Sequence, residues 1–331
     1  MGNNITPESI ETIEKDEKQT PQQVVQNKFD EKNYLNVKLN TEKGELSREI
    51  KIRILPIDSE ENAPFKKVHM HYVKVNKHIS DKGFKNYICI KRTEGIDKDT
   101  YGSKCPYCEI ANDAWKKYNE ATDPSEKTEW LNLFKANCSD EYGIIRCIER
   151  GHENEGPKFW KFRLRTDKLD AMNTILKLYH TRRNESIEEK YGTDFLKKPR
   201  EEQEAIFEKD GFTPFNLLDI YEGKDLKLSL EAVYDKNGKL TDKVTVNITD
   251  YGSVKPISQN EDEIEQWIND TKKWSDVFTI KPYEYLKILS EGKSPYFDKK
   301  ENKWVEWDED FKNKQSNAEY NEVIDENDVP F

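Results

Sequence analysis

The sequence predicts an α+β protein: a short-stranded antiparallel β-barrel with inserted helices and a small subdomain rich in cysteine and histidine. Three observations carry this prediction. Six or seven segments alternate apolar and polar residues, as half-buried strands do. Segments with helical periodicity separate some of these strands. Three of the five cysteines and three of the five histidines fall within residues 65–110.

A polar arm precedes the first strands. Residues 1–33 are rich in Glu, Gln, Asn and Lys and have few apolar anchors, which predicts a flexible segment. Alternation begins at residues 34–39 and continues at 48–56, where Ile50 and Ile52 share one face while Lys51 and Arg53 share the other. This pattern predicts a strand with its basic residues turned outward. Residues 66–75 and 84–91 predict a hairpin.

Helices and strands follow in the middle of the chain. The pattern becomes helical after residue 108, and Asp123-Pro124-Ser125 is a start signal for a second helix that runs to residue 137. Strands are predicted at 142–150 and 158–165, an amphipathic helix at 167–180, and charged helical pieces at 182–210. Residues 225–235 and 243–253 predict another hairpin, with Asn237-Gly238 in its turn.

The C-terminal part reads as surface helices at 262–277 and 281–289, followed by an acidic, disordered stretch at 299–331. We therefore expect a flexible arm at 1–33, a barrel core at 34–259 with a subdomain at about 60–140, C-terminal helices at 260–298, and a tail at 299–331. Among short-stranded barrels, an OB-like fold is the natural candidate, and its open face binds oligonucleotides.

The charge distribution indicates a polyanionic ligand. The net charge is -11, but the acidic excess lies beyond residue 200, whereas 31–92 and 156–200 are positive. A basic body with an acidic tail is typical of a protein that binds a polyanion. No apolar run is long enough to span a bilayer, and the N-terminus does not resemble a signal peptide. Clustered cysteines favour a reducing compartment, so we expect a cytoplasmic protein.

The cysteines predict a metal site. Cys105 and Cys108 form a CxxC pair, and Cys89 supplies a third thiolate. The fourth ligand is one of three nearby histidines: His69, His71 and His78. A tetrahedral Cys3His set suits one structural Zn²⁺ ion. The alternatives are a free CxxC pair and a redox dithiol, but no βαβ unit precedes the pair. No HxE or HExxH frame accompanies it, so we expect no enzyme. Cys138 and Cys147 read as small buried residues.

Aromatic and basic residues alternate around this site and in the later strands. Such an arrangement holds single strands, because bases stack on rings while phosphates meet cations. The alternative is that the rings are core residues, and we expect about half of them to reach a ligand. The candidate DNA contacts are Tyr72, Lys74, Phe84, Lys85, Tyr87, Lys91, Arg92, Tyr107, Arg146, Trp160, Lys161, Phe162, Arg163, Arg165 and Tyr234.

The C-terminal tip is a candidate docking motif. An acidic run usually only confers solubility, but this one ends in Pro330 and Phe331 after Asp325 and Asp328. A terminal ring can enter an apolar pocket while the neighbouring carboxylates meet basic residues.

Several of these motifs resemble one family. His71, Cys89 and the Cys105–Cys108 pair, with Asn62-Ala63-Pro64-Phe65 before them and Glu153-Asn154-Glu155-Gly156 after, are similar to the zinc-containing single-stranded DNA-binding proteins of T4-like bacteriophages. The resemblance covers about residues 45–260. It implies an OB-fold with a zinc subdomain, self-association on DNA, host-cell cytoplasm, and an acidic tail that recruits replication and repair proteins. It also favours His71 as the ligand, although a longer segment before Cys89 keeps His69 and His78 open.

Two further features qualify this resemblance. Residues 182–210 resemble an insertion, and the tip is similar to that of bacterial single-stranded DNA-binding proteins. The sequence thus predicts a single-stranded DNA-binding protein of DNA replication, recombination and repair. The alternative is a zinc-stabilised protein that binds single-stranded RNA or regulates translation.

Overall fold

The computed structural model describes residues 31–57, 63–77, 79–80, 82–164, 170–278, 280–298 and 301–307. It is an α+β structure with an antiparallel sheet, as predicted. The described chain divides into two compact units. Unit 1 contains His71–Ser139 and the segment from Ser275 onward, and unit 2 contains Glu31–Met70 and Asp140–Trp274.

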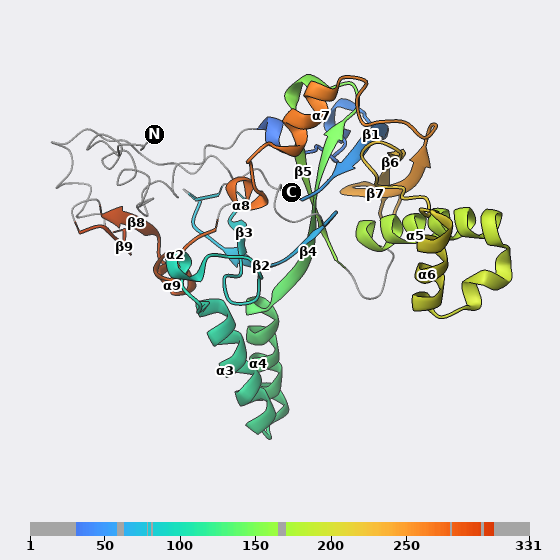
Figure 1. The fold of residues 1–331 in the computed structure, drawn as a ribbon. Coiled ribbons are helices and arrows are strands. Elements are labelled where there is room, and N and C mark those ends of the chain that lie inside the picture. Colours follow the sequence, from blue (N-terminus) through green and yellow to red (C-terminus); the bar gives the residue numbers. More distant parts are fainter. Residues whose placement is uncertain are drawn as a thin grey trace, which may run out of the picture. The chain divides into compact units, whose positions relative to one another are not determined.

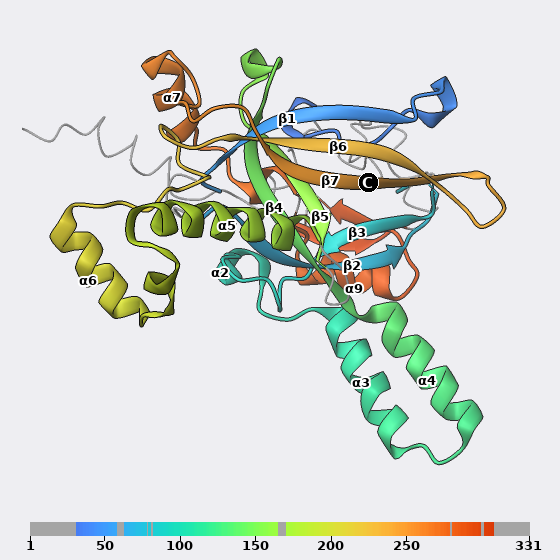
Figure 2. The ribbon, with the colours of Figure 1, turned by 90° about the vertical axis from the view of Figure 1, so that its right-hand side faces the viewer.

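Unit 2 is built on five antiparallel strands in the order β5-β4-β1-β6-β7. In chain order they are β1 (Ser47–Leu55), β4 (Ser139–Glu149), β5 (Lys158–Arg163), β6 (Asp225–Tyr234) and β7 (Leu240–Tyr251). β1 lies in the middle and pairs with both β4 and β6. β6 and β7 form the predicted hairpin, with the positive-φ Gly238 in its turn. Figure 2 shows β1, β6 and β7 side by side.

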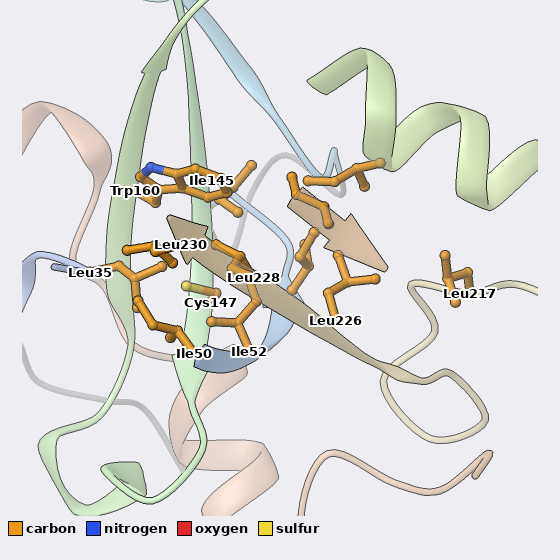
Figure 3. Packing of buried hydrophobic residues seen from close by; sticks show 13 residues of the cluster. Leu35, Ile50, Ile52, Ile145, Cys147, Trp160, Leu217, Leu226, Leu228 and Leu230 are labelled. Atoms are coloured by element: carbon orange, nitrogen blue, oxygen red, sulfur yellow. The ribbon is translucent and has the colours of Figure 1, made fainter. Parts of the chain in front are cut away.

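One face of this sheet carries the main hydrophobic core (Figure 3). Even-numbered residues of β1 and β6 point into it, as period-2 alternation requires. The buried members that Figure 3 labels are Leu35, Ile50, Ile52, Ile145, Cys147, Trp160, Leu217, Leu226, Leu228 and Leu230. Helix α5 (Ala171–Tyr191) adds Ile175 to the same cluster.

The prediction that Arg53 turns outward to solvent is wrong. Arg53 is fully buried, and its guanidinium donates to the carbonyls of Asp219 and Lys255 at 2.8 Å each. A second apolar cluster near this end of the sheet, which includes Ile257 and Trp267, provides the cover. Alternation identifies the two faces of a strand but does not reveal that loops cover the second face.

Helix α5 begins at Ala171, with Asp170 as its N-cap, whereas the sequence predicted a start at residue 167. The Asp170 carboxylate accepts the Asn173 N–H at 2.8 Å, and the helix continues to Tyr191, well beyond the predicted end. A 3₁₀ turn (Thr193–Lys197) and α6 (Arg200–Asp210) follow. Tyr191 stacks on Phe195 at 4.3 Å between centroids, within a small aromatic cluster. The charged stretch at 182–210 therefore has its own apolar centre.

Unit 1 begins within β2 (Lys66–Lys74), which pairs with β3 (Phe84–Ile88). A short helix α2 (Lys98–Tyr101) leads to α3 (Pro106–Glu120) and α4 (Pro124–Asn137), which lie side by side (Figure 1). The Asp123 carboxylate accepts the N–H groups of Ser125 and Glu126 at 2.8 and 3.1 Å, so the predicted start signal is confirmed.

The C-terminal elements differ from the prediction in two places. The single helix predicted at 262–277 is two helices, α7 (Glu261–Ile268) and α8 (Trp274–Val277), because α7 ends at Asn269. After α9 (Tyr283–Ser290), β8 (Pro295–Asp298) pairs with β9 (Lys303–Glu306) in a hairpin. β8 falls in the predicted helical segment (260–298) and β9 in the predicted disordered tail (299–331). Trp304 packs edge-on against Tyr285 at 4.8 Å, which anchors that hairpin to α9.

The segment predicted as a strand at 34–39 also differs. Tyr34 makes one isolated bridge to Phe159, and the following residues have no ladder. None of the described helices combines the length and the apolar character that crossing a bilayer requires.

Candidate metal centre and surface residues

Four buried side chains of unit 1 converge on one point. His71 comes from β2, Cys89 follows the end of β3, and Cys105 and Cys108 lie at the start of α3. Cys105 is the N-cap residue and Pro106 the first helical residue, so the turn into α3 brings both thiols together. The four ligand atoms all lie within 4.8 Å of one another, so these residues can hold one metal ion.

The distances within this cluster fit a tetrahedral site. Metal–sulfur and metal–nitrogen bonds of about 2.3 and 2.0 Å imply S···S and S···N separations of about 3.8 and 3.5 Å. The Sγ atoms of Cys89 and Cys108 are 3.4 Å apart. His71 Nε2 lies 3.2 Å from Cys105 Sγ and 3.7 Å from Cys108 Sγ. These three separations differ from the ideal values by a few tenths of an ångström.

A backbone carbonyl orients the histidine ligand. His71 Nδ1 lies 2.9 Å from the carbonyl oxygen of Asn137, the last residue of α4. A carbonyl only accepts, so Nδ1 carries the proton and Nε2 presents its lone pair to the thiols. This contact also fastens the end of α4 to the site. Sequence patterns do not reveal it, because every residue type has a carbonyl.

Of the three candidate histidines, His71 is the one that lies in the cluster. His69 is half-buried and its Nε2 lies 3.8 Å from a carboxylate oxygen of Glu141, in unit 2. His78 lies outside the described residues. The expected set of His71 with three cysteines is therefore confirmed as a cluster that can bind metal.

Without a bound metal ion, the thiols of this cluster form hydrogen bonds with one another. Hydrogen bonds from Cys105 and Cys108 lower the pKa of Cys89 to about 3. The hydrogen bonds with Cys108 and Cys89, together with burial, raise the pKa of Cys105. One thiolate is thus held by its neighbours, which is a donor set suited to a soft or borderline cation.

The two remaining cysteines lie elsewhere. Cys147 is fully buried in the core of unit 2, where burial raises the pKa of its thiol. Cys138 is only half-buried at the C-cap of α4, so the prediction of a buried residue holds for Cys147 alone.

Contacts from α9 support the metal-binding cluster. The Tyr283 hydroxyl donates to a carboxylate oxygen of Glu109, one residue after Cys108, at 2.9 Å. The hydroxyls of Tyr87 and Tyr285 lie 3.2 Å apart. The C-terminal helix therefore packs against both β3 and α3.

Five candidate DNA contacts lie in the core instead of on the surface: Lys85, Tyr87, Tyr107, Arg146 and Trp160. Burial prevents the three rings from stacking on a base. The Arg146 guanidinium donates to the Trp267 carbonyl at 2.7 Å, so it serves the packing of unit 2. Tyr107 lies in the first turn of α3, and the other four lie on strands whose alternation does not reveal that both faces are covered. They are not part of the exposed surface.

Other candidates reach solvent, and two of them form a stacked pair. The rings of Tyr72 and Phe84 lie 4.9 Å apart and within 5° of parallel, and they are 57% and 43% exposed. His71 and Tyr72 are consecutive in β2, so the ring pair lies on the face opposite the metal-binding cluster. The further exposed candidates are Lys74, Lys91, Arg92, Arg163 and Tyr234.

Two candidates on β5 are half-buried. Lys161 lies 5.5 Å from the centroid of Tyr142, and burial, with Lys38 nearby, lowers its pKa to about 8. Phe162 covers Gly143 on the neighbouring strand. Arg165 and the tail candidates Asp325, Asp328, Pro330 and Phe331 lie outside the described residues.

Comparison with known proteins adds no relative. No protein-family model matches the chain, and no curated protein matches it either.

Proposed function

We propose that this protein binds single-stranded DNA through exposed rings and cations and uses one structural zinc ion to brace that surface. The observation that carries the proposal is the stacked pair of Tyr72 and Phe84. Large rings left in solvent and already parallel offer a platform on which a base stacks without reorganising the protein. Lys74, two residues after Tyr72 in β2, is exposed on the same face and suits a phosphate.

The strand order of unit 2 supports an OB-like fold. In such a barrel the first strand pairs with the second and the fourth, and a helix commonly precedes the fourth. Here β1 pairs with β4 and β6, and α5 lies between β5 and β6 in sequence. The second and third strands of an OB-fold bind oligonucleotides. Their counterparts, β4 and β5, carry Lys161, Phe162 and Arg163 at partly or fully exposed positions.

Zinc is the proposed metal because three thiols and an imidazole form its usual structural ligand set. All four tetrahedral positions come from protein, which leaves none for a substrate. The ion then has a structural role, and we propose no enzymatic activity. In replication, recombination and repair, the tail would recruit partner proteins through its acidic tip.

Titration with oligo(dT) tests the proposal through quenching of intrinsic fluorescence. We expect salt-sensitive binding of the single strand and much weaker binding of the matched duplex. Replacing both rings, Tyr72→Ala with Phe84→Ala, should weaken binding by about 1–3 kcal/mol, which is the contribution of one stacked base. Tyr221→Ala is the control, because Tyr221 is similarly exposed but lies in unit 2, outside the predicted set.

Three results would contradict the proposal: no binding, equal affinity for duplex, or equal loss in the control variant. Tighter binding of oligo(U) than of oligo(dT) at matched salt would favour the RNA-binding alternative instead.

A further inference from the structure

Unit 2 carries a second group of basic residues on the face of its sheet opposite the main core. Odd-numbered residues of β1, β6 and β7 point to this face, because the even-numbered ones fill the core. Lys51 and Lys227 lie directly opposite each other on β1 and β6, and Thr249 on β7 is opposite Lys227. Like charges opposite each other weaken a sheet, so packing alone does not favour this pair.

An aromatic ring and a third lysine complete the group. The Lys51 ammonium lies 4.3 Å from the ring centroid of Tyr251, which is 40% exposed. Tyr251 is opposite Asp225 in the strand register, and the Lys255 ammonium lies 3.2 Å from the Asp225 carboxylate. We call Lys51, Lys227, Lys255 and Tyr251 the cationic ledge.

The cations of the ledge share their carboxylate partners, and Lys51 contacts a ring. The buried Asp225 contacts three cations: Arg53 at 3.6 Å, Arg150 at 2.6 Å and Lys255 at 3.2 Å. Arg150 also lies 3.9 Å from Glu153, and Lys227 lies 3.0 Å from Glu49. Five cations and three carboxylates make these contacts, while Asp219 also acts on Arg53 and the exposed Glu231 lies further along the same face of β6. The side chain of Lys255 is 44% exposed, so a ligand can reach this charge.

The polar residues around the ledge favour a phosphate backbone over an acidic peptide. Ser229 and Asn247 follow the lysines along the same face, and Thr249 lies between them and Tyr251. Hydroxyl and amide groups donate readily to phosphate oxygens. A peptide such as the C-terminal tip, which ends in an apolar ring, needs an apolar pocket as well as cations. Side chains of the ledge offer charge and hydrogen bonds.

We propose that a bound single strand continues across the cationic ledge, which adds phosphate contacts to those of the proposed binding surface. This inference rests on the proposed function, and it implies that a long strand contacts both the ledge and the cations of β5, Lys161 and Arg163, which the strand register puts on the same face of the sheet. The ledge contributes charge contacts and little base stacking, since Lys51 already lies over the ring of Tyr251.

The test compares two double variants of the full chain, each lacking two positive charges. Lys51→Gln with Lys255→Gln alters the ledge, and Lys197→Gln with Lys209→Gln removes two exposed lysines at the 3₁₀ turn and α6. Binding of a long oligo(dT) is measured over a range of salt concentrations. Each phosphate contact to a single strand contributes about 0.7 to the slope of log K against log[salt]. We expect the ledge variant to lose about 1.4 from that slope and the control to lose almost nothing.

Strand length separates local contacts from a general field effect. The shortest oligo(dT) that wild type binds should show no difference between the ledge variant and the control. Lys51→Arg with Lys255→Arg should restore the wild-type slope, because it keeps both charges. Urea unfolding midpoints check that each variant is folded.

Three outcomes would overturn the inference: equal slopes in the ledge and control variants, an equal loss at every strand length, or a ledge variant that loses affinity for a synthetic peptide of residues 308–331 but not for DNA. Failure of the proposed function looks different, because wild type would then not bind oligo(dT) at all.

Discussion

Removing the metal should unfold unit 1 and leave unit 2 folded. The four ligands join β2, β3 and α3, and the Asn137 carbonyl adds α4 through His71. Helix α4 has no fully buried residue and packs on α3 through partly exposed rings, such as Phe134 against Trp115 at 4.9 Å, so its position depends on that of α3. Unit 2 has a separate core that includes none of the ligands.

The expected magnitude follows from the ligand set. Metal binding to a structural site of this kind contributes about 10–16 kcal/mol of apparent free energy near pH 7. The total stability of a domain is about 5–15 kcal/mol. The metal-free unit 1 therefore has a net stability near zero or below, and its amide protection should fall to that of a largely open chain.

Hydrogen exchange before and after chelation measures this effect. Protein purified without chelators should contain about one zinc ion per chain, and exchange after chelation should accelerate in β3, α3 and α9 but not in β1 and β6. His71→Ala should reproduce the result without a chelator, and His69→Ala should not, because His69 lies outside the cluster. Unchanged protection of α3 after complete zinc removal would refute the reasoning.

Three further predictions concern unit 2. Asp225→Asn should lower the free energy of unfolding in urea by about 3–5 kcal/mol, because it leaves buried cations without their carboxylate. Asp194→Asn, at an exposed ion pair, should lower it by less than about 1 kcal/mol, and similar losses in the two variants would contradict this reasoning. Affinity for oligo(dT) should decline as the pH rises through about 8, where Lys161 loses its proton, and Lys161→Gln should flatten that decline. The free energy of unfolding should instead rise between pH 8 and 10.5, because Lys161 keeps its proton in the unfolded chain over that range. Gly143→Ala should lower the free energy of unfolding by about 1–3 kcal/mol or displace Phe162, because the added Cβ would lie 2.5 Å from that ring. An unchanged unfolding midpoint together with unchanged packing of Phe162 would contradict this prediction.

Local chemistry made much of the metal centre predictable. Two cysteines three residues apart at a helix start can hold one ion whatever the rest of the fold does, so Cys105 and Cys108 were accessible from spacing. Choosing His71 over His69 required either the family resemblance or the coordinates, because both residues lie on the same face of β2.

Burial on a second face was not predictable in the same way. Arg53 and Arg146 sit on strands whose pattern predicts outward cations, yet both are covered by segments far away in sequence. The hairpin of β8 and β9 was missed for a related reason. Its strands are only four residues long and lie in a stretch rich in charged residues, and the Trp304 ring meets its partner in α9 only after folding.

The α3–α4 hairpin is attached to the metal centre through the start of α3 and the end of α4, so the turn that joins the two helices can change in length. Cys105 and Cys108 hold its first turn, and Asn137 holds its last. Each doubling of a connecting segment costs only about 0.6 kcal/mol of closure entropy. Helical turns added or removed around Asp123 would therefore leave the ligand geometry intact. This makes the tip of the hairpin a natural place to insert a fluorescent or affinity label without disturbing either the metal centre or the stacked rings.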